Sequence, residues 1–310
     1  MTNDTARPKV ITVVGGSGFL GSHVADQLSN AGYQVRIYDR NPSPWLRDNQ
    51  EMLVGDILDK DRLESAIAGS EVVYNFAALS DLNEALAKPF DTVRINVLGN
   101  LQVLDACRAH EVKHFVYAST VYVYSREGGF YRCSKQAAEH YVEEYQKSFG
   151  LDYTILRYGS LYGPRSDTTN GLFRIVSDAL ELGRIRYRGS PDAMRQYVHV
   201  EDVARASVTA LGPEFVNQSV VLTGQEPMRV FDMLKMLAEI LGISDKVEFV
   251  EGDYLGHYVR TPYAYQPKLG RKYTPPLHVD LGQGLLQLIE HVRSSRHDPF
   301  VASFKDNINV

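Results

Sequence analysis

The stretch VITVVGGSGFLG, residues 10–21, carries the strongest fold signal of the chain. Val10–Val14 is an apolar, mostly β-branched run of the kind that forms buried strands. It leads into glycines that satisfy both G-x-G-x-x-G and G-x-x-G-x-x-G, and a helical pattern begins at Phe19. A strand, a glycine turn and a helix in this order predict a phosphate-binding turn. The glycines let a pyrophosphate approach the backbone, and the helix N-terminus offers free N–H groups.

Strand-like and helix-like segments alternate through the first half of the chain. Runs rich in Val, Ile, Tyr and Phe predict strands at Val10–Val14, Gln34–Tyr38, Glu51–Val54, Glu71–Phe76, Lys113–Ala118 and Tyr153–Leu156. Apolar residues at three- and four-residue steps predict helices at Phe19–Asn30, Asp61–Ala68, Asp91–His110 and Ser134–Phe149. This alternation predicts an α/β fold with a doubly wound parallel sheet, the Rossmann arrangement, covered by helices on both faces.

The alternation stops after Tyr162, where the turn signal Gly163-Pro164 follows. We expect residues 1–165 to form a dinucleotide-binding domain, to which 197–224 return as a helix, Val198–Leu211, and an edge strand, Val220–Thr223. Residues 166–196 and 225–310 are expected to form a smaller C-terminal α/β domain that binds substrate. Further helices are predicted at Gly171–Leu182, Met228–Leu241 and Leu281–Arg293, and an irregular segment at Tyr258–Pro276.

The composition argues against a nucleic-acid-binding protein and against a membrane protein. The 310 residues are 44% hydrophobic and carry a net charge of −5, whereas nucleic-acid binders usually have a basic surplus. The sequence shows neither an apolar signal core nor a stretch long enough to span a bilayer, so we expect no membrane association. Cys107 and Cys133 lack metal-type spacing and are expected to be reduced thiols in or near the core. We therefore expect a cytoplasmic protein without a bound metal.

The second predicted strand ends in Asp39, roughly 20 residues past the glycines, as in dinucleotide-binding units. A carboxylate there accepts hydrogen bonds from the adenosine ribose hydroxyls and repels a 2′-phosphate, which favours NAD over NADP. Arg40 leaves NADP open, because a neighbouring guanidinium accommodates such a phosphate. Further candidate cofactor contacts follow the third and fourth strands, at Asp56, Ile57, Ala77 and Ala78.

A candidate catalytic set follows the fifth predicted strand. Tyr131 and Lys135 are four residues apart at the start of a predicted helix, so they share one face. An ammonium beside a phenol stabilises the phenolate, and we expect it to lower the pKa of Tyr131 enough to give a base near neutral pH. Thr120 closes the strand at the edge where such sheets bind ligands, and its hydroxyl can hydrogen-bond the oxygen of the reacting carbon.

Together these features resemble the NAD-dependent epimerase/dehydratase family, an extended short-chain dehydrogenase/reductase family whose familiar member is UDP-glucose 4-epimerase. The resemblance spans about residues 8–225 and is weaker beyond them. It rests on motifs in the family's order: the glycine run, Asp39, Ala77-Ala78, Asn96 with Gly99 and Asn100, Ser119-Thr120, Tyr131 with Lys135, Arg157 with Tyr162-Gly163-Pro164, and Arg195 with His199-Val200-Glu201-Asp202.

The resemblance implies roles for these positions. Thr120, Tyr131 and Lys135 are implied to be catalytic, with Tyr131 as the base and Lys135 as a ligand of the nicotinamide ribose. Further implied NAD contacts are Gly15, Gly18, Phe19, Leu20, Gly21, Asn96, Ser119 and Tyr158. Implied substrate contacts are Leu79, Ser80, Thr120, Ser160, Tyr187, Arg195 and Arg260, where Arg195 would grip a diphosphate through its charge and fork geometry. His199 is expected to be a structural hydrogen-bonding residue.

Several functions stay open on the sequence. A nucleotide-sugar 4-epimerase, the reading that the resemblance favours, passes the C4 hydride of a UDP-sugar to tightly bound NAD and takes it back on the opposite face. A nucleotide-sugar 4-keto reductase, or another NAD(P)-dependent nucleotide-sugar oxidoreductase, is the alternative, and a non-catalytic dinucleotide-binding or interaction protein belongs to another class. Dehydration is disfavoured, because Val121 and Tyr122 stand where family dehydratases carry an acidic pair.

Two further expectations follow from the family pattern. The Val121–Phe130 connection is shorter than the family's usual loop, which predicts a more open or differently roofed sugar pocket. The predicted helices Asp91–His110 and Ser134–Phe149 correspond to those that form a four-helix interface in family dimers. The resemblance therefore implies a homodimer.

Overall fold

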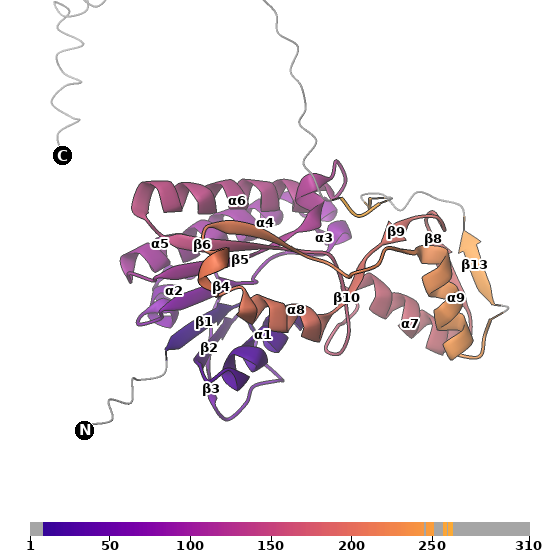
Figure 1. Ribbon diagram of the computed structural model, residues 1–310, viewed down its shortest axis with the longest axis horizontal. Coiled ribbons are helices and arrows are strands. Elements are labelled where there is room, and N and C mark those ends of the chain that lie inside the picture. The colour runs from indigo at the N-terminus through magenta and orange to yellow at the C-terminus, as the bar shows by residue number, and fades with distance from the viewer. Residues whose placement is uncertain (1–8, 245, 251–256, 259, 263–310) are drawn as a thin grey trace, which may run out of the picture. The chain divides into compact units, whose positions relative to one another are not determined.

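A seven-stranded parallel sheet organises the protein, whose computed structural model describes residues 9–244, 246–250, 257–258 and 260–262. Its strand order is β11-β6-β5-β4-β1-β2-β3 (Figure 1). The order reverses between β1 and β4, where doubly wound sheets bind ligands at the carboxyl ends of their strands. The strands are β1 Val10–Val14, β2 Gln34–Asp39, β3 Gln50–Val54, β4 Val72–Asn75, β5 His114–Thr120, β6 Asp152–Tyr158 and β11 Gln218–Leu222.

Helices cover both faces of this sheet, and each face has its own apolar core (Figure 1). One face packs against α2 Lys60–Ile67, α5 Asn100–Ala109 and α6 Gly129–Phe149, and the other against α1 Phe19–Asn30 and α8 Val200–Thr209. All seven residues of β5 are buried, as expected for a central strand covered on both sides. The fold is therefore a Rossmann-like α/β arrangement, as the sequence predicts.

A third apolar core lies in a smaller lobe. It is formed by α7 Gly171–Leu182, β8 Ile185–Arg188, α9 Val230–Ile240 and β13 Val247–Val250. Two short strand pairs join parts of the chain, β7 Ser160–Tyr162 with β10 Tyr197–His199 and β9 Met194–Arg195 with β12 Met228–Arg229. The described residues belong to one compact unit, Met1–Gln266, and the other unit, Pro267–Val310, lies outside them. The predicted division into two domains therefore stays a prediction.

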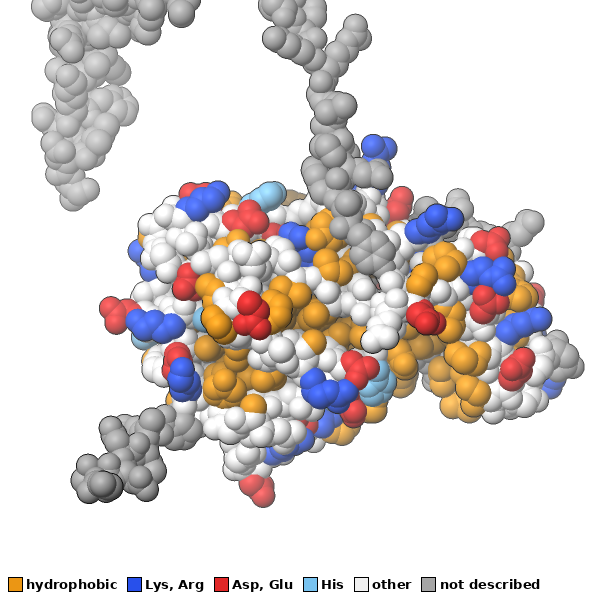
Figure 2. Space-filling model, in the orientation of Figure 1, with side chains coloured by type: hydrophobic (Ala, Val, Ile, Leu, Met, Phe, Trp, Pro, Cys, Tyr) orange, Lys and Arg blue, Asp and Glu red, His pale blue; other side chains and the backbone are white. Residues whose placement is uncertain are grey.

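The lobe also leaves apolar side chains at its surface. Leu180 and Leu182 on α7 and Ile240 on α9 are exposed. Figure 2 shows apolar atoms gathered over these helices, and positive and negative side chains interspersed elsewhere on the same face.

Several elements differ from the sequence predictions. Asp91–His110 is not one helix, because α4 Pro89–Val93 leads into a π-helical turn, Arg94–Gly99, before α5 begins. The helix predicted from Ser134 begins at Gly129 instead. Met228–Leu241 starts as β12 rather than as a helix, and a short helix, α3 Leu82–Ala87, was not predicted. Leu281–Arg293 and most of Tyr258–Pro276 lie outside the described residues.

The sequence also predicted the state of the cysteines and the absence of membrane spans and of a bound metal. Cys107 is buried, but Cys133 is exposed on α6, so the expectation that both pack in or near the core is wrong for Cys133. Within the described ranges, no helix combines the length and the apolar character needed to cross a bilayer. Among the same residues, no group of three or more His, Cys, Asp or Glu side chains is placed to hold a metal ion.

Candidate active site

The glycine turn between β1 and α1 leaves space where a phosphate is expected. Gly15 has a φ of 79°, and a Cβ there would lie 2.5 Å from the backbone nitrogen of Ala77, which follows β4. A Cβ on Gly21 would lie 2.3 Å from the carbonyl oxygen of Gly15, so the start of α1 packs tightly on the turn. At Gly18 the nearest atom would be 3.4 Å away, so protein packing alone does not require a glycine there. Gly18 is the N-cap of α1 without a side-chain cap, which leaves the first N–H groups of α1 for a phosphate.

Asp39 closes β2 beside this turn. Its Oδ2 accepts a hydrogen bond from the backbone nitrogen of Ser17 at 3.1 Å, and its Oδ1 accepts one from the backbone nitrogen of Asn41 at 3.0 Å. The Ser17 hydroxyl donates to the carbonyl of Asn41 at 2.8 Å, which ties the turn to the end of β2. Arg40 is exposed next to this carboxylate. The carboxylate is thus held at the place where an adenosine ribose is expected.

Two buried asparagines fix the loop after β4. The Oδ1 of Asn75 accepts from the backbone nitrogen of Ala77 at 3.1 Å. Asn96 lies in the π-helical turn, and its amide accepts from the nitrogen of Leu79 at 2.7 Å and donates to the carbonyl of Leu79 at 3.0 Å. Single π turns within helices are frequent at functional sites. Asn96 therefore fixes the backbone of the loop after β4, while its direct contact with NAD stays a prediction.

The three predicted catalytic side chains converge at the carboxyl end of β5. Because α6 begins at Gly129, Tyr131 lies in its first turn and Lys135 one turn later. The side chain of Thr120, the last residue of β5, lies close to the Tyr131 phenol and acts to lower its pKa. Lys135 is only 2% exposed and donates from Nζ to the carbonyl of Ala118 at 2.6 Å. Its Nζ lies 5.9 Å from the centre of the Tyr131 ring.

The pKa values of this trio differ from the sequence expectation. Burial lowers the pKa of Lys135 to about 7, although the nearby Glu139 carboxylate opposes this shift. Burial raises the pKa of Tyr131 to about 12, against the lowering effect of the Thr120 hydrogen bond. The expectation that Lys135 lowers the pKa of Tyr131 is therefore wrong for the protein alone. Nζ of Lys135 donates to the Ala118 carbonyl, and burial, which penalises the phenolate, dominates the pKa of Tyr131.

A buried ion pair supports the trio from behind. Glu139, one helical turn beyond Lys135, accepts two hydrogen bonds from Arg157, with Nε–Oε1 at 3.0 Å and Nη2–Oε2 at 2.6 Å. Arg157 also donates to the hydroxyl of Tyr124. The Ser119 hydroxyl donates to Glu139, so this predicted NAD contact has its side chain engaged within the protein. The pair joins α6 to β6, and the Ser119 bond adds the end of β5; the predicted catalytic side chains lie on α6 and β5.

An aromatic cluster brings the predicted substrate residues together. Arg195 lies over the ring of Tyr258, with its Cζ 4.7 Å from the ring centre. The hydroxyls of Ser160 and Tyr258 are 3.2 Å apart. The ring of Tyr122 lies against Tyr258, with 4.8 Å between ring centres, and its hydroxyl is 2.7 Å from Nδ1 of His257. Ser160 and Arg195 are therefore linked through Tyr258, which the sequence analysis did not select.

Other predicted contacts are placed less favourably. Tyr158 is buried, and its hydroxyl bonds the hydroxyl of Ser207 at 2.7 Å, so its side chain is committed to the core and only its backbone remains at the end of β6. The ring of Tyr187 packs edge-on against Phe249 in the core of the smaller lobe. Two predicted positions are exposed, Ser80 and Arg260. Their contacts with ligands stay predictions.

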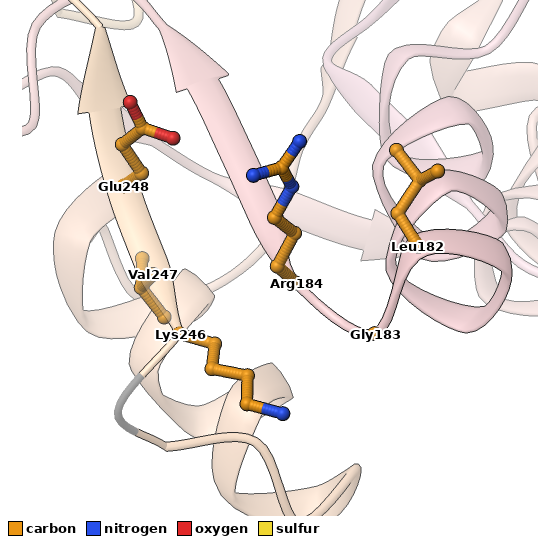
Figure 3. Close-up of a pocket in the computed structure, with 6 residues that line it drawn as sticks. All are labelled: Leu182, Gly183, Arg184, Lys246, Val247 and Glu248. Atoms are coloured by element: carbon orange, nitrogen blue, oxygen red, sulfur yellow. The ribbon is translucent and has the colours of Figure 1, made fainter.

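A cavity of about 300 Å³ lies apart from this set of residues (Figure 3). It is open to solvent, and Figure 3 shows it between the end of α7 and the strands β8 and β13. Its lining consists of Leu182, Gly183, Arg184, Lys246, Val247 and Glu248. None of the predicted site residues lines this cavity, so we assign it no part in the reaction.

Residues 11–221 match the model of the NAD dependent epimerase/dehydratase family, which is more than half of the chain. The chain belongs to the NAD-dependent epimerase/dehydratase family. A putative UDP-glucose 4-epimerase of Methanocaldococcus jannaschii is 31% identical over 252 residues, covering 73% of this chain and 81% of that protein. A dTDP-glucose 4,6-dehydratase of Actinoplanes is 26% identical, and the alignment covers 92% of this chain and 98% of that protein.

The fold also matches solved structures of this family. The crystal structure of UDP-glucose 4-epimerase from Thermotoga maritima with UDP-glucose superimposes with a TM-score of 0.75 at 26% identity, covering 93% of this chain and all of that one. The chain is thus a member of a family of NAD-dependent nucleotide-sugar epimerases and dehydratases, and its cofactor is NAD.

Several residues of the candidate site were not predicted from the sequence. Glu139 follows Lys135 by four residues, and this helical spacing was a signal for a shared face. Tyr122 was noted only for replacing an acidic residue. His257 and Tyr258 gave no local signal, because they reach the site from more than 120 residues away along the chain from Tyr131.

Proposed function

We propose that this family member is a nucleotide-sugar 4-epimerase that acts on a UDP-sugar. The observation that carries the proposal is the convergence of Tyr131, Thr120 and the buried Lys135 at the carboxyl end of β5. The residues that follow Thr120 are Val121 and Tyr122, neither of which carries a carboxylate. The similarity to a UDP-glucose 4-epimerase in complex with UDP-glucose supports the substrate class.

The residues of the crevice fit NAD. The open side of the turn at Gly18, the uncapped start of α1 and the carboxylate of Asp39 match a pyrophosphate and a ribose. When bound, NAD supplies the hydride acceptor, and its oxidised ring carries a positive charge that favours a neighbouring phenolate. A positive charge beside Tyr131 lowers the pKa of its phenol, which burial alone raises to about 12.

The protein's own groups then have distinct tasks. Tyr131 takes the proton of the C4 hydroxyl and returns it, and the Thr120 hydroxyl orients the oxygen that gives it up. Lys135 is positioned by the Ala118 carbonyl to bind the cofactor's ribose hydroxyls. Arg195 would hold the diphosphate, about which the sugar would turn to present its other face.

Dehydration is the second reaction that the relatives suggest. The dTDP-glucose 4,6-dehydratase relative covers nearly the whole chain. Elimination of water needs an acid and a base besides the catalytic tyrosine. Val121 cannot transfer a proton, and Tyr122 offers a phenol rather than a carboxylate. The geometry therefore favours epimerisation over dehydration.

The test combines the cofactor and the reaction. Protein purified without added cofactor is denatured, and the released nucleotide is identified; the enzyme is then assayed with UDP-glucose, UDP-N-acetylglucosamine and UDP-glucuronate. We expect oxidised NAD and interconversion of one sugar with its C4 epimer. Tyr131→Phe should retain NAD and lose at least about 10²-fold in kcat. If the protein releases no nucleotide and oxidises added NADPH with a keto-sugar nucleotide as substrate, it is a reductase instead.

We also propose a homodimer. Apolar side chains are exposed along α4, the π-helical turn and α6, and Phe90 is 90% exposed. Val93, Leu98 and Tyr141 are exposed in the same three elements. Burial of these apolar side chains against a second copy of the chain would be favourable, as in the family's four-helix interface.

A further inference from the structure

We propose that Asp26 is a positioning residue for NAD, because it holds the loop of residues 40–49 that fixes the carboxylate of Asp39. This carboxylate lies where the adenosine ribose is expected. The inference rests on the NAD site described above and does not depend on which reaction the enzyme performs. Asp26 lies in α1, about two helical turns after its start, and is only 4% exposed.

The loop of residues 40–49 is held mainly by polar contacts. Nearly all of its residues are exposed, Trp45 among them. At its first end, the backbone nitrogen of Asn41 donates to Asp39, and the carbonyl of Asn41 accepts from the Ser17 hydroxyl. A displaced loop would therefore take one hydrogen-bond partner away from the Asp39 carboxylate and leave its orientation less well defined.

Asp26 anchors the far end of this loop to α1. Its Oδ1 lies 2.8 Å from Nε of Arg47 and accepts a hydrogen bond from Nε2 of Gln50 at 3.2 Å. Arg47 also donates to Oδ1 of Asn30, the last residue of α1, at 2.8 Å. Gln50 is buried and begins β3, so the carboxylate holds the loop where the chain re-enters the sheet.

A second arginine reaches the same carboxylate from the loop after β7. Nη2 of Arg165 lies 2.7 Å from Oδ2 of Asp26, and its guanidinium carbon is 4.9 Å from the centre of the Trp45 ring. Nε2 of His23, also on α1, is 3.0 Å from the carbonyl oxygen of Pro164. Arg165 has a φ of 65°, which is unfavourable for a residue with a side chain, so its contacts hold it there. Arg165 thus links the buried carboxylate to the middle of the exposed loop.

Two arginines depend on one buried carboxylate. Its two oxygens accept from both guanidinium groups, and such charge-assisted hydrogen bonds are stronger than neutral ones. Without Asp26, both cations would lose the charge that compensates them, and the loop would lose two anchors at once. The close packing of Gly15 and Gly21 in the phosphate-binding turn does not involve these side chains. We therefore expect NAD to be held less tightly at its adenosine end.

Exchange of bound NAD against an excess of isotopically labelled NAD, measured on the NAD-loaded protein, tests this role. Asp26→Ala and Arg165→Met should each exchange NAD at least about tenfold faster than the wild type, the effect of losing one charge-assisted hydrogen bond. Arg165→Lys keeps a cation near Asp26 without the planar group over Trp45, and should restore part of the wild-type rate. Arg47→Met should also accelerate exchange, and it decides the matter if Asp26→Ala does not fold.

The fluorescence of Trp45 reports on the loop directly, because this is the only tryptophan of the chain. In the NAD-loaded protein, Asp26→Ala and Arg165→Met should make Trp45 more accessible to quenching by acrylamide. The physical reason is that the ring loses the guanidinium that lies over it.

Arg36→Met is the matched control for a loss of stability. Arg36 lies in β2, and its hydrogen bonds go to Glu51 in β3 and to the carbonyls of Ala66 and Ala68 at the end of α2. This variant should lower the melting temperature but keep the wild-type exchange rate and the wild-type quenching of Trp45.

Three results would overturn the inference. If Asp26→Ala and Arg165→Met expose Trp45 but exchange NAD at the wild-type rate, the loop does not position the cofactor. If Arg36→Met accelerates exchange as much as Asp26→Ala, the cause is a loss of stability. A wild type that retains no NAD would also contradict the inference. The proposed epimerisation fails on a different result, which is an NAD-loaded wild type that converts no UDP-sugar.

Discussion

At the scale of single residues, two glycines with a positive φ allow the effect of backbone strain to be distinguished from that of steric contact. Gly15 and Gly32 have φ values of 79° and 88°, but only at Gly15 would a Cβ meet the loop after β4. We expect Gly15→Ala to displace the phosphate-binding turn and to abolish co-purification of NAD. Gly32→Ala should cost roughly 1 kcal/mol of stability through strain alone and retain NAD. Equal NAD content in the two purified variants would contradict this role of the turn.

Lys135 makes stability depend on pH in a defined direction. Burial lowers its pKa from 10.5 to about 7, so between these values the unfolded chain holds a proton that the folded protein lacks. The free energy of unfolding therefore rises with pH across this window, by up to about 1.4 kcal/mol per unit from this group. Below about pH 7 the group contributes its full penalty, because both states are then protonated.

Lys135→Met removes this dependence. Urea unfolding at pH 7.5 and 9.0 should show wild type gaining roughly 1 to 2 kcal/mol relative to the variant. Lys60→Met, at an exposed position of α2, should show no such change relative to wild type. If the difference between wild type and Lys135→Met is the same at both pH values, Lys135 is not buried as described.

Single residues of the site were predictable where their chemistry depends on local spacing. Tyr131 and Lys135 are one helical turn apart, and Thr120 closes a strand, so their convergence follows from the fold class. The direction of the Tyr131 pKa shift was not predictable, because it depends on burial and on the Ala118 carbonyl that holds Lys135. These are tertiary properties that no local pattern specifies.

At the scale of elements, the buried pair of Glu139 and Arg157 joins α6 to β6. The two side chains are 7% and 15% exposed, so the charge of each is compensated mainly by the other. Glu139→Gln or Arg157→Met alone should cost roughly 3 kcal/mol, because removing one partner leaves an uncompensated buried charge. The double variant should recover part of that loss. A urea double-mutant cycle measures the coupling.

A surface pair supplies the matched control for this cycle. Arg186 and Glu248 form an ion pair across β8 and β13 and are about half exposed. Arg186→Met should cost less than about 1 kcal/mol. If Arg157→Met costs no more than this, the buried pair does not hold the two elements together.

Elements with strong periodicity were predicted well, and irregular ones were not. Val10–Val14, Phe19–Asn30 and Gly171–Leu182 have the bounds that the sequence indicates. The break at Arg94–Gly99 was missed, because a π-helical turn is continuous with the helices that flank it and differs from them in its i→i+5 hydrogen bonds. Asn96 lies in this turn and accepts a hydrogen bond from the backbone nitrogen of Leu79.

At the scale of the whole molecule, the exposed apolar face predicts self-association. Phe90→Glu and Tyr141→Glu place charges on α4 and α6, and the double variant should be a monomer by light scattering where the wild type is a dimer. Ile240→Glu, on the exposed side of α9, serves as the control and should leave the dimer intact. A monomeric wild type, or a dimer that survives the double variant, would contradict the proposed interface.

The doubly wound parallel sheet is the part of the molecule that the sequence predicts most completely, since alternating strands and helices leave few topologies. The smaller lobe was predicted only as a set of helices, because β8, β9, β12 and β13 are short and pair over long distances in the chain. The approach of His257 and Tyr258 to Tyr122 is of the same kind.

Transfer of an isotopic label tests the proposed reaction most directly. The enzyme is given UDP-glucose that carries deuterium at C4, or another accepted UDP-sugar labelled in the same way, in unlabelled water without added cofactor. Return of the hydride within one active site predicts that the C4 epimer keeps its deuterium at C4 and that no reduced cofactor is released. Loss of the label to solvent, or its appearance in free reduced cofactor, would contradict the mechanism.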